Sequence, residues 1–505
     1  MNVARALTWT AERHPTRRAV GGPRPMTYRE WDARTNRLAR ALERLGVARG
    51  DRVAFLLSGG EPLASLHLAA QKLGATSVPL STRFGPDEVA YCLGDAEPVL
   101  LVTDDAAVDS APTTARSAQH VDVSDVDTWA AQASDGALPG EPDDRDTSVM
   151  LYTSGTTGRP KGVPRTHAAE HAAAVAHLVQ TQHRTGEVTL GVMPLFHTMG
   201  LRSLLASIVA GGTWVPQARF DADESLALIS SEGVTALYLV PTVYWSLLHT
   251  GRLDGVTTVS RLAYAGAAMT PALAERLGQA LRPDVFVNHF GSTEVYTFTI
   301  GPDALAKPGC AGRAGLFSRV RLVDPDPAAT PDAVVRRGEQ GQVAVSMRSP
   351  EAFAGYWQRP DADARAIRDG WYLTGDLATE DDDGDLWVSG RVDDMINSGG
   401  ENLYPDEIEA TLARCDAVDE VVVVGLPDDR WGQAVTAFVL PRAGLSPAEA
   451  VREVQRYGTE RLPSIQRPKR VVAVGEIPKS AVGKILRRTL VAGDFEPLAD
   501  SGAGR

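Results

Sequence analysis

A loop-forming segment in the first third of the chain carries the residue types that bind a polyphosphate. Residues 151–163 read Leu-Tyr-Thr-Ser-Gly-Thr-Thr-Gly-Arg-Pro-Lys-Gly-Val, and a strand-like run at 148–152 leads into this segment. Glycines let backbone N–H groups approach an anion, hydroxyls donate hydrogen bonds, and Lys161 supplies a positive charge. The spacing G-x-x-x-x-G-K-S/T is not met, because Lys161 lies between Pro160 and Gly162. We therefore expect a phosphate-binding loop of a different kind.

Two further segments carry charges that suit a metal ion and anionic groups. Glu294 follows Gly-Ser-Thr at the end of an expected strand at 285–290, and open α/β sheets bind ligands at strand ends. A carboxylate in this place can hold Mg²⁺, which takes oxygen ligands from protein and phosphates together. Lys484 lies in the stretch 467–488, which contains seven Lys or Arg residues and one Glu. An ammonium group from this stretch can neutralise the charge of an anionic ligand.

The composition predicts a folded, acidic protein. The chain has 505 residues, with 51 Lys and Arg against 64 Asp and Glu and a net charge of −13. Such a chain has no long-range attraction for nucleic acid or an anionic membrane, so we expect neither as a partner. Its three cysteines lack C-x-x-C spacing and support neither a disulfide framework nor a zinc site. The start has no continuous apolar run, and we expect a cytoplasmic protein.

The elements that must position these residues alternate between helix and strand. Helical spacing predicts helices at 28–45, 62–73, 222–232 and 270–281; apolar runs predict strands at 52–57, 75–80, 188–193, 236–240, 261–265 and 285–290. This alternation implies β-α-β units with largely parallel sheets. Residues 103–147 read as surface elements and a long loop.

The pattern changes in the last third of the chain. Residues 341–347 and 385–389 read as antiparallel strands, with a turn at 381–385 before the second. After residue 390 an amphipathic helix is expected at 404–414 and a β-branched strand at 418–426. The change indicates a small C-terminal domain.

The segment 151–163 resembles the phosphate-binding signature of the adenylate-forming superfamily, which includes acyl- and aryl-CoA ligases, luciferases and the adenylation domains of peptide synthetases. Further segments match this family's signatures in its order and spacing over nearly the whole chain, at 194–200, 288–294, 370–376, 390–394, 398–402 and 478–484. The C-terminal third looks most like the benzoate and 4-chlorobenzoate CoA ligases.

The resemblance implies a fold and a reaction. We expect an α/β fold: a large N-terminal domain at 1–391, made of two α/β subdomains and a β-rich subdomain, and a small mobile α+β domain at 392–505. We expect an ATP- and Mg²⁺-dependent aryl-acid CoA ligase. In its first step the acid and ATP give an aryl adenylate and pyrophosphate, and in its second the thiol of coenzyme A displaces AMP.

The resemblance also implies catalytic residues. Lys484 would bridge the substrate carboxylate and the α-phosphate, Glu294 would hold Mg²⁺ beside Thr293, and His197 would position the acyl group. No general base is needed, because a carboxylic acid is already ionised at pH 7. Asp393 would be the hinge about which the small domain rotates, since Lys484 must leave before a second nucleophile can reach the carbonyl.

Two cofactor sites follow by the same resemblance. The ATP site would be formed by Thr153, Ser154, Gly155, Thr156, Thr157, Gly158, Lys161, Ser292, Asp376 and Arg391. The coenzyme A site would be formed by Arg83, Gly399, Gly400, Trp431, Arg467 and Lys469. Ile465 departs from the pattern, since the resembling enzymes place an aromatic face for adenine there, so contact of this segment with coenzyme A is in doubt.

By their positions relative to the resembling enzymes, the residues expected to line the acyl pocket are Val175, Thr198, Met199, Tyr238, Ala267, His289, Gly291 and Tyr296. The space between Tyr238, Gly291 and Ala267 predicts a flat, aromatic acid. His289, Thr198 and Tyr296 are more polar than a plain benzoate needs, and an unpaired buried polar group costs about 1–3 kcal/mol. We therefore expect a hydroxyl or amino substituent on the ring.

Two other functions stay open. A stand-alone adenylation enzyme would load the acid onto the phosphopantetheine of a carrier protein. Amino-acid enzymes of this kind usually place an Asp near Tyr238, so acids without an α-amine are favoured. A catalytically silent nucleotide-binding scaffold is disfavoured by the presence of Lys484, Glu294 and Asp376 together. The sequence leaves open whether the protein forms a homodimer.

Overall fold

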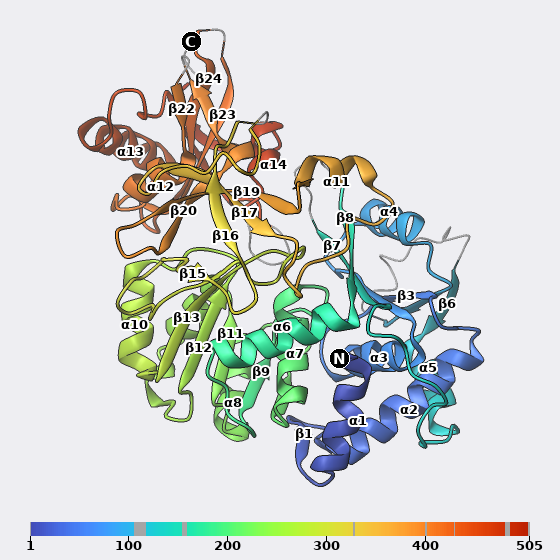
Figure 1. Ribbon diagram of the computed structural model, residues 1–505. Coiled ribbons are helices and arrows are strands. Elements are labelled where there is room, and N and C mark those ends of the chain that lie inside the picture. The colour runs from blue at the N-terminus through green and yellow to red at the C-terminus, as the bar shows by residue number, and fades with distance from the viewer. Residues whose placement is uncertain are drawn as a thin grey trace. The chain divides into compact units, whose positions relative to one another are not determined.

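The computed structural model describes residues 2–105, 118–153, 159–326, 329–398, 401–428, 430–479 and 485–502 (Figure 1). The chain forms two compact units. The first comprises Met1–Val320 and Val345–Tyr372, and the second comprises Arg321–Ala344 and Leu373–Arg505.

The first unit contains a six-stranded sheet of order β6-β5-β3-β4-β7-β8. Its strands are parallel apart from the last pair, which is antiparallel. The strands are β3 (Arg52–Leu56), β4 (Thr76–Pro79), β5 (Leu100–Thr103), β6 (Gln119–Asp122), β7 (Thr147–Thr153) and β8 (Lys161–Thr166). The accompanying helices are α2 (Tyr28–Arg44), α3 (Glu61–Leu73), α4 (Pro86–Ala96) and α5 (Val123–Ala131).

A nine-stranded sheet in the same unit has the order β15-β14-β13-β12-β11-β9-β10-β1-β2. Its central strands are parallel: β10 (Thr213–Pro216), β9 (Val188–Gly191), β11 (Ala236–Leu239), β12 (Arg261–Ala265) and β13 (Val285–Phe290). The edge strands are β1 (Arg18–Val20), β2 (Met26–Thr27), β14 (Thr299–Ile300) and β15 (Arg313–Ala314). The remaining helices are α1 (Val3–Arg13), α6 (His167–Gln180), α7 (Thr198–Val209), α8 (Ala222–Glu232), α9 (Pro241–His249), η2 (Leu253–Gly255) and α10 (Pro271–Leu281).

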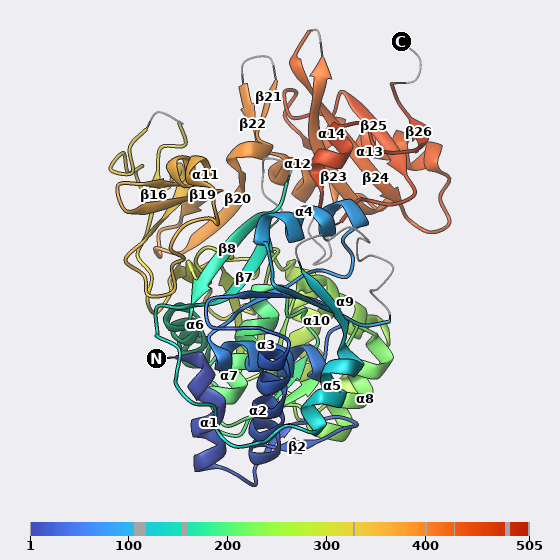
Figure 2. The ribbon, with the colours of Figure 1, turned by 90° about the vertical axis from the view of Figure 1, so that its right-hand side faces the viewer.

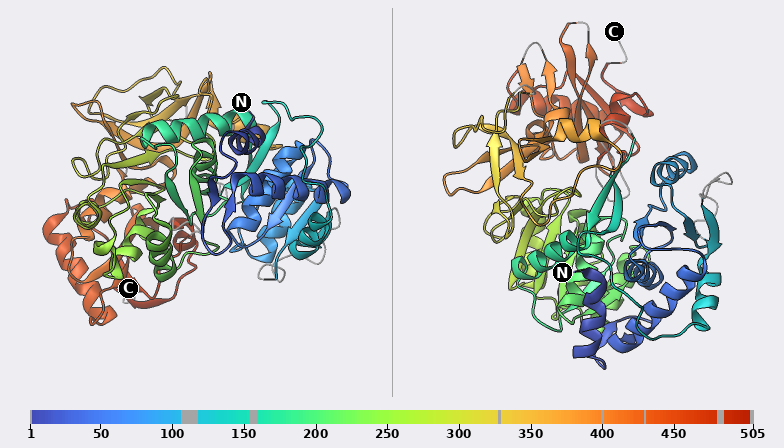
Figure 3. Two further views of the ribbon diagram at one scale, coloured as in Figure 1. Left: turned by 90° about the horizontal axis from the view of Figure 1, so that it is seen from below. Right: turned by 45° about the vertical axis from the view of Figure 1, so that its right-hand side comes forward.

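One hydrophobic core joins the two sheets of the first unit. It contains residues of β3, β5 and β10 together with residues of α1, α2, α3, α6 and α7, and these helices lie side by side in Figures 2 and 3. Helix α2 shows why the sequence folds in this way. Thr27 and Glu30 form a capping box at its start, and Trp31, Leu38 and Leu42 on one face are buried. The predicted alternation of helices and parallel strands is confirmed.

A five-stranded sheet has the order β16-β17-β19-β18, with β20 paired to β19, and the division into units passes through its strands. The strands are β16 (Val320–Val323), β17 (Gln340–Ser346), β18 (Ile367–Arg368), β19 (Trp371–Glu380) and β20 (Leu386–Arg391), and α11 (Pro360–Ala366) precedes β18. The two strands predicted here are present. The sequence analysis did not predict β19, which is the antiparallel partner of β20 and contains part of the 370–376 motif.

The second unit also contains a sheet of order β22-β21-β24-β25-β26, with β23 paired to β24. Its strands are β21 (Ile396–Ser398), β22 (Glu401–Leu403), β23 (Val418–Asp428), β24 (Gly432–Pro441), β25 (Arg470–Val474) and β26 (Pro497–Asp500). Its helices are η3 (Val392–Asp394), α12 (Pro405–Leu412), α13 (Pro447–Arg461) and α14 (Arg487–Val491). The predicted α/β fold with a small α+β part is confirmed, whereas the domain boundary between residues 391 and 392 stays a prediction.

No helix in the described part of the chain combines the length and apolar character that crossing a membrane requires.

Replacing Tyr244 by Phe should weaken the sheet that carries the acyl residues. The buried hydroxyl of Tyr244 on α9 lies 3.0 Å from the carbonyl oxygen of Leu237 on β11 and 2.9 Å from that of Ala263 on β12. Tyr244→Phe should lower the free energy of unfolding by about 1 kcal/mol, measured by urea unfolding. Ser246→Ala, on the exposed face of the same helix, is the control and should change it by less than about 0.5 kcal/mol. Equal midpoints for the two variants would contradict this role.

Candidate active site

The β7–β8 hairpin holds the two ends of the expected phosphate loop. Thr153 and Lys161 are paired across the hairpin, so the loop leaves and re-enters the sheet at adjacent positions. Five residues expected in the loop, Ser154, Gly155, Thr156, Thr157 and Gly158, lie outside the described residues. The Lys161 ammonium lies 4.2 Å from the ring centroid of Tyr356. Burial lowers the pKa of Lys161, and the charge of Glu294 opposes this shift.

Glu294 lies beside the same tyrosine. The Tyr356 hydroxyl donates to Glu294 Oε1 at 2.7 Å, and Glu294 is buried. Its backbone N–H donates to Ser292 Oγ at 3.2 Å, which fixes the turn that contains Thr293. Lys161, Tyr356 and Glu294 thus converge from three separate segments. Carboxylate oxygens are ligands that Mg²⁺ prefers, and the donor type at Glu294 fits this ion.

The turn after β13 requires glycine at residue 291. A Cβ atom on Gly291 would overlap the carbonyl oxygen of Tyr296. The backbone therefore folds back closely on itself between β13 and Tyr296. This close approach places Ser292, Thr293 and Glu294 directly after the strand end, as the sequence predicted.

A buried arginine that sequence reasoning missed holds this turn. Arg165 on β8 is fully buried, forms an ion pair with Glu170 on α6, and lies with its guanidinium carbon 3.6 Å from the Tyr296 ring centroid. It also donates to the carbonyl oxygens of Thr293 at 3.1 Å, Glu294 at 3.3 Å and Glu351 at 2.9 Å. One guanidinium thus binds the turn that contains Glu294 and a second loop. The only signal in the sequence is a second basic residue, four positions after Lys161, in a short strand with Gly162, Val163 and Pro164 between them.

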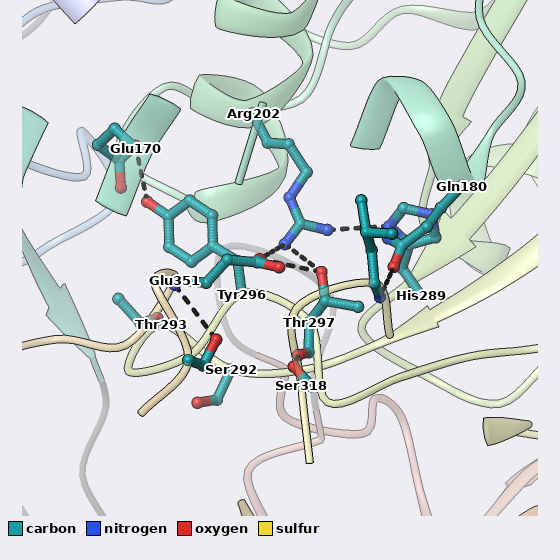
Figure 4. A network of polar contacts seen from close by, with 12 residues as sticks. Glu170, Gln180, Arg202, His289, Ser292, Thr293, Tyr296, Thr297, Ser318 and Glu351 are labelled. Carbon is teal, nitrogen blue, oxygen red and sulfur yellow. Dashed lines mark hydrogen bonds and ion pairs between the residues drawn. The ribbon is translucent and has the colours of Figure 1, made fainter. Parts of the chain in front are cut away.

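The residues expected at the acyl site include a buried aromatic group, shown in part in Figure 4. His289 on β13 and Tyr238 on β11 have ring centroids 5.3 Å apart. His177 on α6 lies 4.8 Å from Tyr238 and 5.2 Å from His289. His177 was not predicted, because a lone histidine on a helix carries no motif. Burial holds the pKa values of both histidines well below the ordinary range, so both rings are neutral.

The other expected acyl residues differ in exposure. Met199 and Tyr296 are buried, Val175 and Thr198 are half-buried, and Ala267 and Gly291 are exposed. The Tyr296 hydroxyl donates to Glu170 Oε2 at 3.3 Å. The polar group of Tyr296 therefore already has a hydrogen-bond partner within the protein.

His197 is the N-cap residue of α7. Its ring Nδ1 accepts from the backbone N–H of Met199 at 3.3 Å. This bond fixes the ring at the start of the helix whose first residues are expected to line the acyl site.

Two predicted nucleotide residues meet in the second unit. Asp376 on β19 and Arg391 on β20 are directly paired in the antiparallel register. Arg391 donates to Asp376 Oδ1 at 2.8 Å and to the carbonyl oxygen of Thr374 at 3.2 Å. The pair places a carboxylate and a guanidinium side by side on neighbouring strands.

Two predicted coenzyme A residues, Trp431 and Lys469, are in contact in the second unit, and the charge of a third, Arg467, acts on Lys469. The Lys469 ammonium lies 5.0 Å and the Arg430 guanidinium carbon 4.9 Å from the Trp431 ring centroid. Burial lowers the pKa of Lys469, and the charges of Arg467 and Arg430 lower it further. Arg430 was not predicted. We call Arg430, Trp431, Arg467 and Lys469 the basic cluster.

The remaining predicted residues are placed as follows. Arg83 is exposed in the first unit, and Asp393 is exposed in η3 of the second. Ile465 packs against the core of the C-terminal sheet. Gly399, Gly400 and Lys484 lie outside the described residues.

Removing the Arg165 charge should destabilise the protein strongly. Arg165→Met leaves Glu170 buried without its ion-pair partner, and we expect a loss of about 3–5 kcal/mol, measured as a lower midpoint of thermal unfolding. The double variant Arg165→Met with Glu170→Leu removes both charges and should recover much of the loss. An unchanged midpoint for Arg165→Met alone would show that this ion pair does not hold the turn.

Comparisons with known proteins agree with this geometry. A family model described as AMP-binding enzyme matches residues 7–357, and the model of the AMP-binding enzyme C-terminal domain matches residues 407–484. A long-chain-fatty-acid–CoA ligase of Mycobacterium tuberculosis is 34% identical over 479 residues, which cover 92% of each chain. A 4-chlorobenzoate–CoA ligase of Arthrobacter is 32% identical over 496 residues, which cover 96% of this chain and 94% of that protein.

The fold is also found among solved structures. An anthranilate CoA ligase in complex with anthranoyl-AMP superposes with a TM-score of 0.86 at 27% identity, covering 98% of this chain and 97% of the other. The motif order, the sheet topology and these matches lead to one conclusion. The chain belongs to the AMP-binding enzymes of the adenylate-forming superfamily and is an acid–thiol ligase of the AMP-forming kind.

Proposed function

We propose that the protein adenylates an aromatic carboxylic acid with ATP and transfers the acyl group to the thiol of coenzyme A, releasing AMP and pyrophosphate. The observation that carries the proposal is the convergence of Lys161, Tyr356 and Glu294 beside the strand ends that hold the phosphate loop. A cation and a carboxylate at that place suit a polyphosphate with its metal ion.

The first half-reaction joins two anions, and the chain supplies groups for both. Lys161 and the loop hydroxyls bind the phosphates, Asp376 accepts from the ribose hydroxyls, and Arg391 contacts the nucleotide. Glu294 would hold Mg²⁺, which supplies positive charge at the phosphate oxygens. Lys484 bridges the substrate carboxylate and the α-phosphate, while His197 positions the acyl group. This charge stabilisation is the largest effect in such transfers.

The second half-reaction needs a different arrangement of the same chain. Lys484 withdraws as the small domain turns about Asp393, at the boundary between residues 391 and 392, and Gly399 and Gly400 replace it. The basic cluster supports coenzyme A as acceptor, because its cations around an indole suit the phosphates and adenine of that cofactor. Arg83 would add a further phosphate contact.

The acid we propose is flat and carries a hydroxyl or amino group. Tyr238, His177 and His289 offer ring faces to an aromatic substrate. Two relatives act on benzoates by name, one on 4-chlorobenzoate and one on anthranilate. Because the Tyr296 hydroxyl is bonded to Glu170, the polarity argument rests on His289 and Thr198.

Pyrophosphate release should be more efficient with aromatic acids than with a long-chain fatty acid. A screen of substituted benzoates, with a long-chain fatty acid as the comparison, should give the highest kcat/KM for a substituted benzoate. Thioester formation is then measured with coenzyme A and with a phosphopantetheinylated carrier protein. We expect the coenzyme A thioester to form at least about tenfold faster, because only coenzyme A carries the phosphates that the basic cluster fits. A preference for the fatty acid or for the carrier protein would refute the respective half of the proposal.

Two variants should separate the half-reactions. Lys484→Ala should slow adenylate formation by roughly 10²–10³-fold, while thioester formation from a supplied adenylate is spared. Asp393→Pro should have the opposite effect, because a fixed φ angle hinders rotation. Both steps are measured separately in single-turnover assays. Equal loss of both steps in each variant would disprove this division of labour.

A further inference from the structure

One buried histidine at the acyl site has a bonded nitrogen and an unbonded one. His289 is 1% exposed, and its Nδ1 lies 2.9 Å from a guanidinium nitrogen of Arg202 on α7 (Figure 4). Its Nε2 is buried and has no hydrogen-bond partner within the described part of the chain. This nitrogen is part of the His289 ring, which packs against the rings of Tyr238 and His177.

The partner of Nδ1 decides where the imidazole proton is. A guanidinium has five N–H donors and no acceptor, so Nδ1 of His289 must accept from Arg202. Burial and the Arg202 charge hold the pKa of His289 well below its ordinary value, which keeps the ring neutral. A neutral imidazole with an accepting Nδ1 carries its proton on Nε2. His289 thus presents a donor, and not an acceptor, at its unbonded nitrogen.

Arg202 is itself held in place by a second set of contacts. It is 2% exposed, donates to Thr297 Oγ1 at 3.0 Å, and lies 3.5 Å from Glu351 Oε2. The Thr297 hydroxyl donates in turn to the same carboxylate at 3.1 Å. Arg202 is therefore held on the Nδ1 side of the imidazole by a paired and buried charge.

Resting on the proposed function, we propose that Arg202 is a positioning residue that fixes His289 as an N–H donor, so that the enzyme selects aromatic acids whose ring substituent accepts a hydrogen bond. The favoured substituents are hydroxyl, alkoxy and carbonyl oxygens. This inference narrows the proposed choice of a hydroxyl or amino substituent to the oxygen substituents. The lone pair of an aromatic amino group is delocalised into the ring, so an amino group offers only donors to Nε2–H. A buried donor that faces another donor stays unpaired, which is costly.

The substrate profile of the unaltered enzyme is the first test. Hydroxy-, methoxy- and aminobenzoates with the substituent at each ring position are compared with benzoate by kcat/KM for pyrophosphate release. At the best ring position, the hydroxy and methoxy acids should exceed the amino acid by about tenfold or more. An equal or higher value for the amino acid at that position would overturn the inference.

Variants of Arg202 separate a tautomer effect from a loss of packing. Arg202→Lys keeps a donor at Nδ1 and should keep the preference for an oxygen substituent. Arg202→Gln offers an amide oxygen, so Nδ1 can carry the proton and the preference should shift toward the amino acids. It is made together with Glu351→Gln so that no buried carboxylate is left unpaired. Identical substrate profiles for Arg202→Lys and for the double variant Arg202→Gln with Glu351→Gln would contradict the proposed role of Arg202.

A spectroscopic measurement decides the tautomer without activity. In protein labelled with ¹⁵N-histidine, the nitrogen shifts of His289, assigned with His289→Phe, should report a protonated Nε2 in the unaltered enzyme. The Arg202→Gln and Glu351→Gln variant should show a loss of that single state. A protonated Nδ1 in the unaltered enzyme would refute the inference.

The failure of the proposed function has a distinct signature. If no aromatic acid releases pyrophosphate, both the function and the substituent selection are wrong, whatever the nitrogen shifts show. If aromatic acids react but His289→Phe leaves the ratio of hydroxy to amino acids unchanged, the function stands and the selection by His289 is wrong.

Discussion

The buried ion pair of Arg165 and Glu170 is the interaction on which the site depends. The turn after β13 and the loop at residue 351 are irregular, and their carbonyl oxygens need donors once they are buried. Arg165 supplies donors to three of them, at Thr293, Glu294 and Glu351. The ion pair with Glu170 compensates the buried charge of Arg165. A buried charge is tolerated only with good pairing. The bonds of Arg165 therefore hold the turn and the loop in fixed positions next to β8. That arrangement places Glu294 beside Tyr356 and Lys161.

A second buried arginine, Arg202, holds a side chain expected at the acyl site in place in the same way. Arg165 and Arg202 have their guanidinium carbons 3.6 Å and 5.2 Å from the ring centroid of Tyr296, so one aromatic side chain contacts both. Arg165 orders the turn that contains Glu294, and Arg202 orders His289. Groups fixed before the substrate arrives need no rearrangement during the reaction, which is the physical basis of electrostatic catalysis. The polar groups expected to meet metal and acid are therefore held from the same buried region.

The positive charge of the chain is local, since its overall charge is −13. The basic cluster places Arg430 and Lys469 against Trp431 in the second unit, with the charge of Arg467 acting on Lys469, and Lys161 lies at the end of the expected phosphate loop in the first. Local groups of positive charge of this kind can hold a small anionic ligand in a chain whose net charge is negative. This distribution suits small phosphorylated substrates better than nucleic acid.

The sequence alone determined the α/β alternation, the positions of the helices and strands with clear periodicity, and the family, because periodicity and motif spacing are local properties of a chain. It also predicted residues that do meet in space, such as Asp376 and Arg391, through motifs. It did not predict β19 as the partner of β20, nor the roles of Arg165, Glu170, His177, Arg202 and Arg430. For the two buried arginines the decisive partners lie far along the chain: 87 residues separate Arg202 from His289, and 186 separate Arg165 from Glu351. Only the tertiary structure decides which charges are buried together, because burial and pairing arise when distant segments pack.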